Sequence, residues 1–396
     1  MMTWYKNFSS QPHQPFFSSG MAFFILFLFL LFGVYTNELS LNDSILTYHA
    51  YSMIHIVFIQ FFIGFLYVVF PRFLVQAQIK VEKYMKHFYL YFLSSIGFIL
   101  SLIVQNSFIF IFVFLLLVAQ ILSFKTLYEI HKNSKVKNKY DTKWILICFF
   151  IGLLSHFLFF ISFFDTSISF LLKQVAVNSG FYIFLFGIVF AVSQRMVPFF
   201  TQVKVPEYKI RKSSKIMETF FFLMVFKVSF TILDDSLLTL FIDTLFFIFI
   251  VNELVKWRLP IFKVSAIMWV LYISLYWIPV GFFISVLENS FNLLNINCIF
   301  EKASLHSFAL GYFTTILIGF GTRVVLGHSN RTVYANNFTI FLFLFLQIVI
   351  VLRVFASFTL NSGLNYIFWI NISSFFLLLI LILWSSSYLK ILLKGK

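Results

Sequence analysis

Apolar runs of about twenty residues follow one another along the chain, separated by short polar connections. A helix of about 20 apolar residues is long enough to cross the hydrocarbon core of a bilayer. The pattern therefore predicts an all-α fold, a polytopic membrane helix bundle with twelve transmembrane helices. The predicted spans are 20–36, 48–70, 88–105, 107–125, 144–163, 175–196, 217–233, 237–255, 264–287, 304–326, 337–357 and 366–389.

Positive charge alternates between the connections. Six lysines lie in 125–143 and six lysines or arginines lie in 195–215, whereas 37–47 has neither and 234–235 is Asp-Asp. Because cytoplasmic connections carry the excess of Lys and Arg, both termini are predicted to be cytoplasmic. Residues 1–19 then form a cytoplasmic N-terminal segment, and the whole chain, 1–396, is expected to be a single transmembrane domain.

Composition excludes several other classes of protein. Charged residues make up 11% of the chain and the mean hydropathy is +0.96, whereas soluble domains average about 25% charged residues. The net charge of +15 lies largely in the connections, so it indicates topology and a lipid bilayer as partner, and no nucleic acid. The sequence has no Walker-type or G-x-G-x-x-G loop, which argues against ATP-driven transport and dinucleotide binding.

Two histidines lie at the same depth on separate predicted helices. His49 and His306 are at the outer ends of the second and tenth spans. A haem held between two helices takes one imidazole from each side of its ring plane, so these two are the candidate axial ligands of a haem b. Three other histidines, His87, His131 and His156, are interpreted as interfacial or water-facing residues.

A second histidine follows His306 at the far end of the same span. His328 is 22 residues further on, which is roughly 33 Å of helix, the whole hydrocarbon thickness. The two imidazoles therefore belong to different sites. At the inner face the candidate partner of His328 is His13, and the pair would hold a second metal.

Three arginines mark the inner ends of the second, sixth and tenth spans. They are Arg72, Arg195 and Arg323, and they either anchor the spans at the cytoplasmic face or neutralise haem propionates or another anion. Their spacing of four spans suggests three similar groups of helices around a pseudo-threefold axis. Asp243, in the eighth span, is the acidic residue most suited to a proton path.

Several motifs together resemble the NnrS family of bacterial membrane proteins. They are QPHQPFF (11–17), YHAYSMI (48–54), RMVPFFT (195–201), LHSFALGYFTTILIGFGTRVVLGH (305–328) and SNR (329–331). The resemblance implies a multi-pass protein of the bacterial cytoplasmic membrane that contains haem and copper and is linked to nitric oxide and nitrosative stress. On this resemblance His13, His49, His306 and His328 fall on motif histidines, and Arg195 and Arg323 on motif arginines.

The chain departs from the family pattern at one place. Many members read His-Ala-His-Glu where this chain has His49-Ala50-Tyr51-Ser52, so a metal site that needs the second histidine or the acid is not expected here. Residues 49–71 are also similar to the second helix of haem–copper oxidase subunits. The adjacent histidines of an oxidase-type binuclear centre are missing.

Two functions follow from these features. The first is a haem protein that handles nitric oxide by redox or NO-binding chemistry, with an electron donor that the sequence does not identify. Copper is implied only by the family resemblance, and its candidate ligands are His13 and His328. The alternative is a twelve-span transporter of a small metabolite or metal complex.

Overall fold

The computed structural model describes residues 2–41, 45–104, 106–164, 167–329 and 331–394. Within these ranges the secondary structure is helical and contains no strand. Twelve of the helices or continuous helical runs are long and apolar enough to cross a membrane, which confirms the predicted all-α membrane bundle. The predicted end of the third span at residue 105, and Asn330 of the motif at 329–331, lie outside the described residues.

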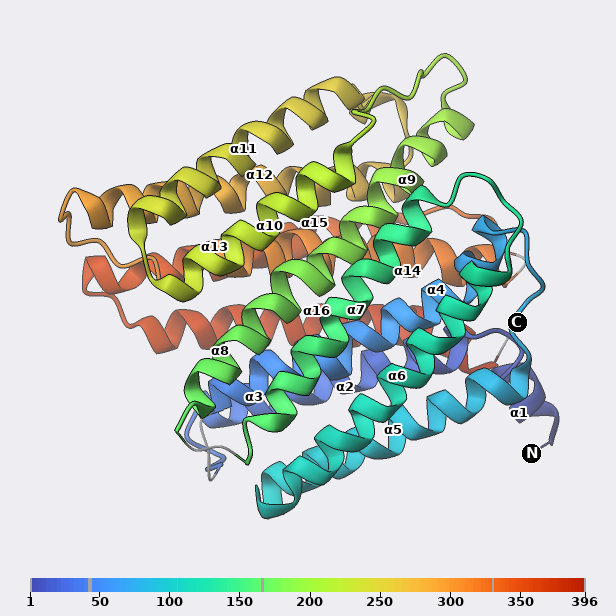
Figure 1. Cartoon of the computed structure of the whole chain (residues 1–396), viewed down its shortest axis with the longest axis horizontal. Coiled ribbons are helices and arrows are strands. Elements are labelled where there is room, and N and C mark those ends of the chain that lie inside the picture. Colours follow the sequence, from blue (N-terminus) through green and yellow to red (C-terminus); the bar gives the residue numbers. More distant parts are fainter. Residues whose placement is uncertain (1, 42–44, 105, 165–166, 330, 395–396) are drawn as a thin grey trace. The chain divides into compact units, whose positions relative to one another are not determined.

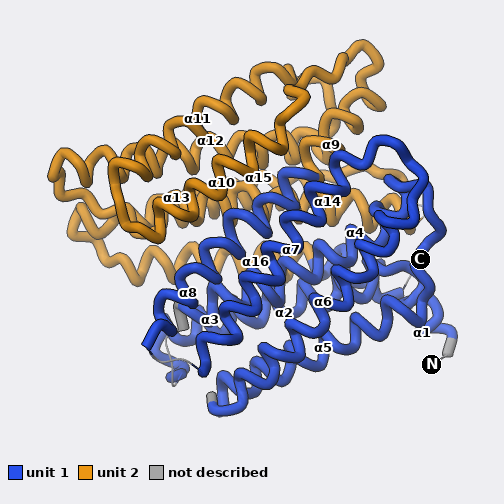
Figure 2. Tube along the Cα trace, in the orientation of Figure 1, with its two compact units in different colours: residues 1–191, 385–396 blue, residues 192–384 orange. Residues whose placement is uncertain are grey.

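The chain forms two compact units (Figures 1 and 2). Unit 1 contains residues 1–191 and 385–396, and unit 2 contains residues 192–384. Two helices, α9 (Phe186–Lys204) and α16 (Tyr366–Lys394), begin in one unit and end in the other.

Unit 1 contains the first five spans and the start of the sixth. Figure 1 shows its long helices running side by side. Its elements are α1 (Met2–Phe8), α2 (His13–Tyr35), α3 (Ile45–Ser52), η1 (Met53–Phe58), α4 (Ile59–Phe73), α5 (Val81–Val104), η2 (Asn106–Phe108), α6 (Ile109–Asn133), α7 (Tyr140–Ile161), α8 (Ser169–Asn178) and η3 (Ser179–Leu185), followed by the start of α9.

Unit 2 contains the end of the sixth span and the spans that follow it. Asp235 and Asn336 cap the first turns of two of its helices, because their side chains accept hydrogen bonds from otherwise unpaired backbone N–H groups. Its elements are α10 (Ile216–Leu233), α11 (Ser236–Trp257), η4 (Ile261–Lys263), α12 (Ala266–Leu293), α13 (Ala303–His306), η5 (Ser307–Thr314), α14 (Thr315–Gly327), α15 (Asn337–Phe358), η6 (Thr359–Ser362) and most of α16.

The first helix starts earlier than the hydropathy pattern indicates. α2 begins at His13, although the predicted span began at residue 20 and residues 13–19 were assigned to the segment before it. Their polar side chains lower the local hydropathy, but they are buried in the structure, and the Ser18 hydroxyl donates to the carbonyl of Gln14 at 2.7 Å. A polar side chain that bonds its own helix in this way is compatible with a buried helix.

Large apolar side chains are exposed along the middle of several spans. Phe29, Leu93 and Phe222 are each more than half exposed. Apolar surface on this scale is stable only against lipid. The helices therefore face a lipid bilayer, and the protein is a multi-pass membrane protein.

Three spans share an unusual backbone. The second, sixth and tenth spans each contain a π-helical segment, at 53–58, 179–185 and 307–314. They are also the most buried spans, with about four-fifths of each apolar window inside the protein. π-helical turns are rare and occur mainly at functional sites. These are the same three spans that contain Arg72, Arg195 and Arg323.

Each of these three spans packs closely against the span that precedes it in the sequence. The close contacts are made at glycines. A Cβ atom added at any of them would come within 3.0 Å of the neighbouring span, so only glycine permits the observed approach. The approaches are Gly20 to Phe61, Gly64 to Phe16, Gly152 to Phe184, Gly180 to Ser155, Gly281 to Phe308 and Gly311 to Trp277. The shared packing supports three related groups of four spans.

Candidate functional site

His306 is held in one tautomer by its surroundings in unit 2. Its Nδ1 lies 2.9 Å from the carbonyl oxygen of Lys302, and its Nε2 lies 3.3 Å from the guanidinium of Arg353. A carbonyl only accepts and a guanidinium only donates. Nδ1 therefore carries the hydrogen, and Nε2 presents a lone pair. A metal-binding histidine has this arrangement, with one nitrogen fixed by a backbone carbonyl and the other available to the metal.

His49 and His306 both precede a π segment on the outer side. His306 is the last residue before η5, and His49 lies in α3 four residues before η1. Both side chains are half-buried. His49 belongs to unit 1 and His306 to unit 2.

The two inner-face histidines differ in burial. His328 is half-buried, and its Nδ1 donates to the Val324 carbonyl at 3.0 Å, which leaves Nε2 as an acceptor. His13 is buried at the start of α2 and packs edge-on against Phe17. Across the described residues, no group of three or more His, Cys, Asp or Glu side chains is arranged to hold a metal ion.

The three predicted arginines have different surroundings. The Arg323 guanidinium lies 3.9 Å from the centre of the Phe200 ring, a close cation–π contact within unit 2. Arg195 is half-buried, and Arg72 is exposed. Arg353, which was not among the predicted site residues, is the cation beside His306. It is the only charged residue in the predicted eleventh span, and that isolation is a signal that could have identified it.

The interpretation of His156 as an interfacial residue is wrong. The side chain is fully buried in unit 1, where its Nε2 lies 2.8 Å from the Tyr51 hydroxyl and its Nδ1 lies 2.7 Å from Oε1 of Gln120. The Gln120 oxygen only accepts, so Nδ1 donates to it and the Tyr51 hydroxyl donates to Nε2. Burial is possible because both ring nitrogens have partners.

A second histidine completes this buried group. The rings of His55 and His156 are 4.2 Å apart, and the Ser155 hydroxyl lies 3.5 Å from Nε2 of His55. We call Tyr51, His55, Gln120, Ser155 and His156 the Tyr51–His156 cluster. Tyr51, which stands where the resemblance led us to expect a second histidine, serves as the hydrogen-bond partner of His156.

His87 is also buried, contrary to its interpretation as a water-facing residue. Its exposed fraction is 6%, and its Nδ1 lies 2.6 Å from the Tyr67 hydroxyl. The lysines beside it in the sequence suggested a position in water, but the hydroxyl of Tyr67 on the neighbouring span provides a polar partner inside the protein. His131 is half-buried and contacts the Thr142 hydroxyl at 3.1 Å.

Comparison with known proteins identifies the family. A search of curated proteins gives no match. The family described as NnrS protein matches residues 7–396, and this range includes all of the motifs on which the resemblance rested. The chain belongs to the NnrS family.

Proposed function

We propose that the protein binds a haem b through His49 and His306 and acts in nitric oxide handling, by redox or NO-binding chemistry at that haem. Membership of the NnrS family supports the link to nitric oxide. It also supports a location in the bacterial cytoplasmic membrane and a role in the response to nitrosative stress.

The tautomer of His306 is the observation that carries the proposal. With Nδ1 bonded to the Lys302 carbonyl, Nε2 is the nitrogen that an iron would take. Arg353 would then lose this contact, and its guanidinium suits a carboxylate such as a haem propionate. Arg353 also has a bond to the Ser357 hydroxyl at 3.0 Å, which holds it near this position.

The inner-face arginines suit a separate role. Arg72 and Arg323 lie in the halves of the second and tenth spans opposite to His49 and His306, and Arg195 lies in the corresponding half of the sixth span. They are proposed to anchor the spans or to bind an anion at the cytoplasmic face. A bound haem would supply one-electron chemistry and a site for nitric oxide. Two imidazole ligands would favour electron transfer over direct binding of nitric oxide, because neither His49 nor His306 would leave a place for nitric oxide on the iron.

The haem proposal predicts a spectral difference between variants. The purified wild-type protein should show the reduced-minus-oxidised spectrum of a haem with two histidine ligands. His49→Ala and His306→Ala should each lose most of the haem or change its axial spectrum, because each removes one ligand. Haem content is measured per protein by pyridine haemochrome assay, together with the optical and electron paramagnetic resonance spectra.

His131→Ala is the matched control, because it removes another half-buried histidine that is not assigned to haem. It should keep the haem content and the spectrum of the wild type. A wild-type protein without haem, or ligand variants with unchanged haem and axial spectra, would contradict the proposal.

Copper is proposed at the inner face, with His13 and His328 as ligands. His328 fits this role because its Nδ1 is bonded to a carbonyl and its Nε2 presents a lone pair. His328→Ala should therefore lower the copper content measured by mass spectrometry, while the haem content stays constant. Copper that is absent from the wild type, or unchanged in the variant, would exclude this assignment.

A transporter is the second candidate function. Few charged pairs are expected inside the membrane from the sequence, but unit 2 contains a buried one, Lys227 and Asp243. Transporters use such pairs to bind substrates or coupling ions. The haem measurement separates the two functions, because a haem-free wild-type protein that carries a solute across liposomes would favour transport.

A further inference from the structure

Unit 2 contains an ion pair inside the membrane-spanning region. The Lys227 ammonium on α10 lies 2.7 Å from Oδ2 of Asp243 on α11, and both side chains are almost fully buried. Counted at 1.5 Å per residue from the outer ends of their helices, the two residues are roughly 10 Å below the outer surface. Charged side chains at such depth are costly and are usually functional.

Two polar side chains of a third helix, α12, also approach Oδ2 of Asp243. The Ser285 hydroxyl donates to Oδ2 of Asp243 at 2.5 Å, and the Asn289 amide lies 3.4 Å from it. Lys227 also lies 3.3 Å from the Ser285 hydroxyl. The lysine, the serine and the asparagine therefore all approach the same one of the two Asp243 carboxylate oxygens.

The second carboxylate oxygen of Asp243, Oδ1, takes no part in these contacts. Oδ1 of Asp243 is buried and has no hydrogen-bond partner among the described residues. A charged oxygen in this state carries a desolvation penalty that a bound proton removes. The arrangement is unlike that of a purely structural ion pair, in which both oxygens would be bonded.

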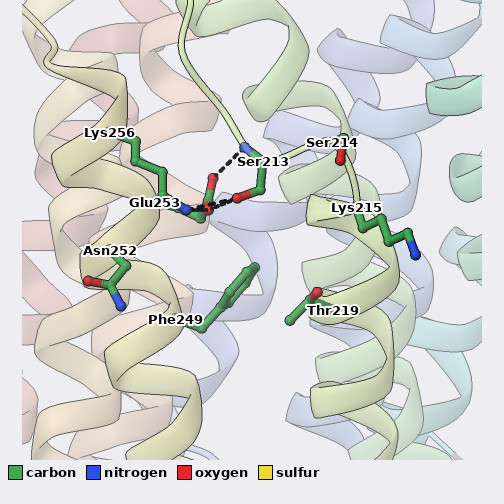
Figure 3. Close-up of a pocket in the computed structure, with 8 residues that line it drawn as sticks. All are labelled: Ser213, Ser214, Lys215, Thr219, Phe249, Asn252, Glu253 and Lys256. Atoms are coloured by element: carbon green, nitrogen blue, oxygen red, sulfur yellow. Dashed lines mark hydrogen bonds and ion pairs between the residues drawn. The ribbon is translucent and has the colours of Figure 1, made fainter.

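Glu253, on the same helix, provides the comparison (Figure 3). Its exposed fraction is 2%, and both of its oxygens are bonded: Oε1 to the Ser213 hydroxyl and the Lys256 ammonium, and Oε2 to the Ser213 backbone N–H. A cavity of about 500 Å³ adjoins it at the end of α11 that is assigned to the cytoplasmic face. Glu253 is therefore a buried carboxylate in which both oxygens accept hydrogen bonds, unlike Asp243.

A second acid lies near the end of α12 that is assigned to the outer face. Glu288 is the residue before Asn289 on α12, and it is half-buried. It lines a cavity of about 320 Å³ together with Asn292, Glu301 and Lys302, at the outer connection between α12 and α13. The charged groups that act on Glu288 are Lys227, Lys302, Asp243 and Glu301.

The balance of these charges indicates a bound proton. Glu301 and Lys302 both line the cavity and carry opposite charges. The other charged groups are two carboxylates, Asp243 and Glu288, and one ammonium, Lys227, so that full ionisation gives a net charge of −1. A low-dielectric interior disfavours that net charge, and one proton shared by the two acids removes it.

We propose that Asp243 and Glu288 share one exchangeable proton beside Lys227, and that this proton comes from the outer aqueous phase through the cavity at residues 292–302. When the proton is taken up, one O–H bond forms on a carboxylate oxygen and the site becomes neutral. When it leaves, it returns to water by way of Glu288. The site requires no haem, so it stands independently of the proposed haem function.

Labelling of the wild-type protein with dicyclohexylcarbodiimide tests the proposal. This apolar reagent modifies carboxylic acids in their protonated form inside the membrane. In sealed right-side-out vesicles, mass spectrometry should find the adduct on Asp243 or Glu288, and raising the external pH at constant internal pH should reduce it several-fold. Changing only the internal pH should leave the adduct unchanged. Glu253 serves as the internal control and should stay unmodified.

Infrared spectroscopy supplies the second measurement. A pH jump on the purified protein should show a carboxylic acid C=O band that is absent from the triple variant Asp243→Asn, Glu288→Gln and Lys227→Met, which removes both acids together with their cation and so leaves the site without net charge. The band should remain in Glu253→Gln. An adduct that is absent, that follows internal pH or that appears equally on Glu253 would overturn the proposal, as would a band that persists in the triple variant.

Discussion

Replacing Lys227 with methionine is expected to destabilise unit 2 by about 3–5 kcal/mol at a pH at which Asp243 is ionised in the unfolded protein, because Asp243 loses its only buried cation and must either stay charged in the membrane interior or bind a further proton. The side chains of the two residues are 6% and 0% exposed, so water cannot screen the remaining carboxylate. Thermal and denaturant unfolding in detergent, followed by circular dichroism, measure the loss.

The double variant separates the cost of the lone charge from the value of the pair. Lys227→Met together with Asp243→Asn should recover most of the loss, because a buried ion pair contributes little beyond its neutral replacement. An exposed pair is the control. Lys83 and Glu129 are also 2.7 Å apart, but their side chains are 44% and 42% exposed. Lys83→Met should therefore change stability by no more than about 1 kcal/mol. Equal effects of Lys227→Met and Lys83→Met would show that burial of the pair is unimportant.

The spans were predictable because bilayer thickness imposes a length on every helix. Twelve apolar runs correspond to twelve observed helices or continuous helical runs, whose ends differ from the predicted ones by up to eight residues. At the start of the first span the difference arises because the polar side chains of His13 to Ser19 are buried. Hydropathy averages over a window, and it cannot distinguish a serine that bonds its own helix from one in water.

The chemistry of single residues was less predictable, because it depends on contacts between spans. His156 is a histidine in an apolar run, and only the approach of Tyr51 and Gln120 from other spans shows why it can be buried. Asp243 was selected from its position in the eighth span, but its partner Lys227 lies in the seventh. The periodicity of the sequence shows which residues share a face of one helix, but it does not show which residues of two different helices meet. Such pairs can be identified only from the packed structure.

The Tyr51–His156 cluster is expected to be the most sensitive polar group of unit 1. Replacing His156 with leucine removes the partners of the Tyr51 hydroxyl and of Gln120 Oε1, which lie 2.8 Å and 2.7 Å from its ring nitrogens. Each buried polar group left unpaired costs about 1–3 kcal/mol, so with two such groups the variant should lose about 2–6 kcal/mol of unfolding free energy. The same unfolding measurements in detergent report this loss.

A double-mutant cycle with Tyr51→Phe isolates the bond between the two side chains. Tyr51→Phe alone leaves Nε2 of His156 unpaired in a fully buried position, and it should cost about 1–3 kcal/mol. The combined variant no longer contains an orphaned Tyr51 hydroxyl or His156 nitrogen, so its loss should fall short of the sum of the single losses by about 0.5–3 kcal/mol. Strictly additive losses would mean that the two side chains do not interact, and the cluster would then have to be divided into independent groups. A coupling in the expected range would instead show that Tyr51, at the position of the missing motif histidine, has become part of the support for His156.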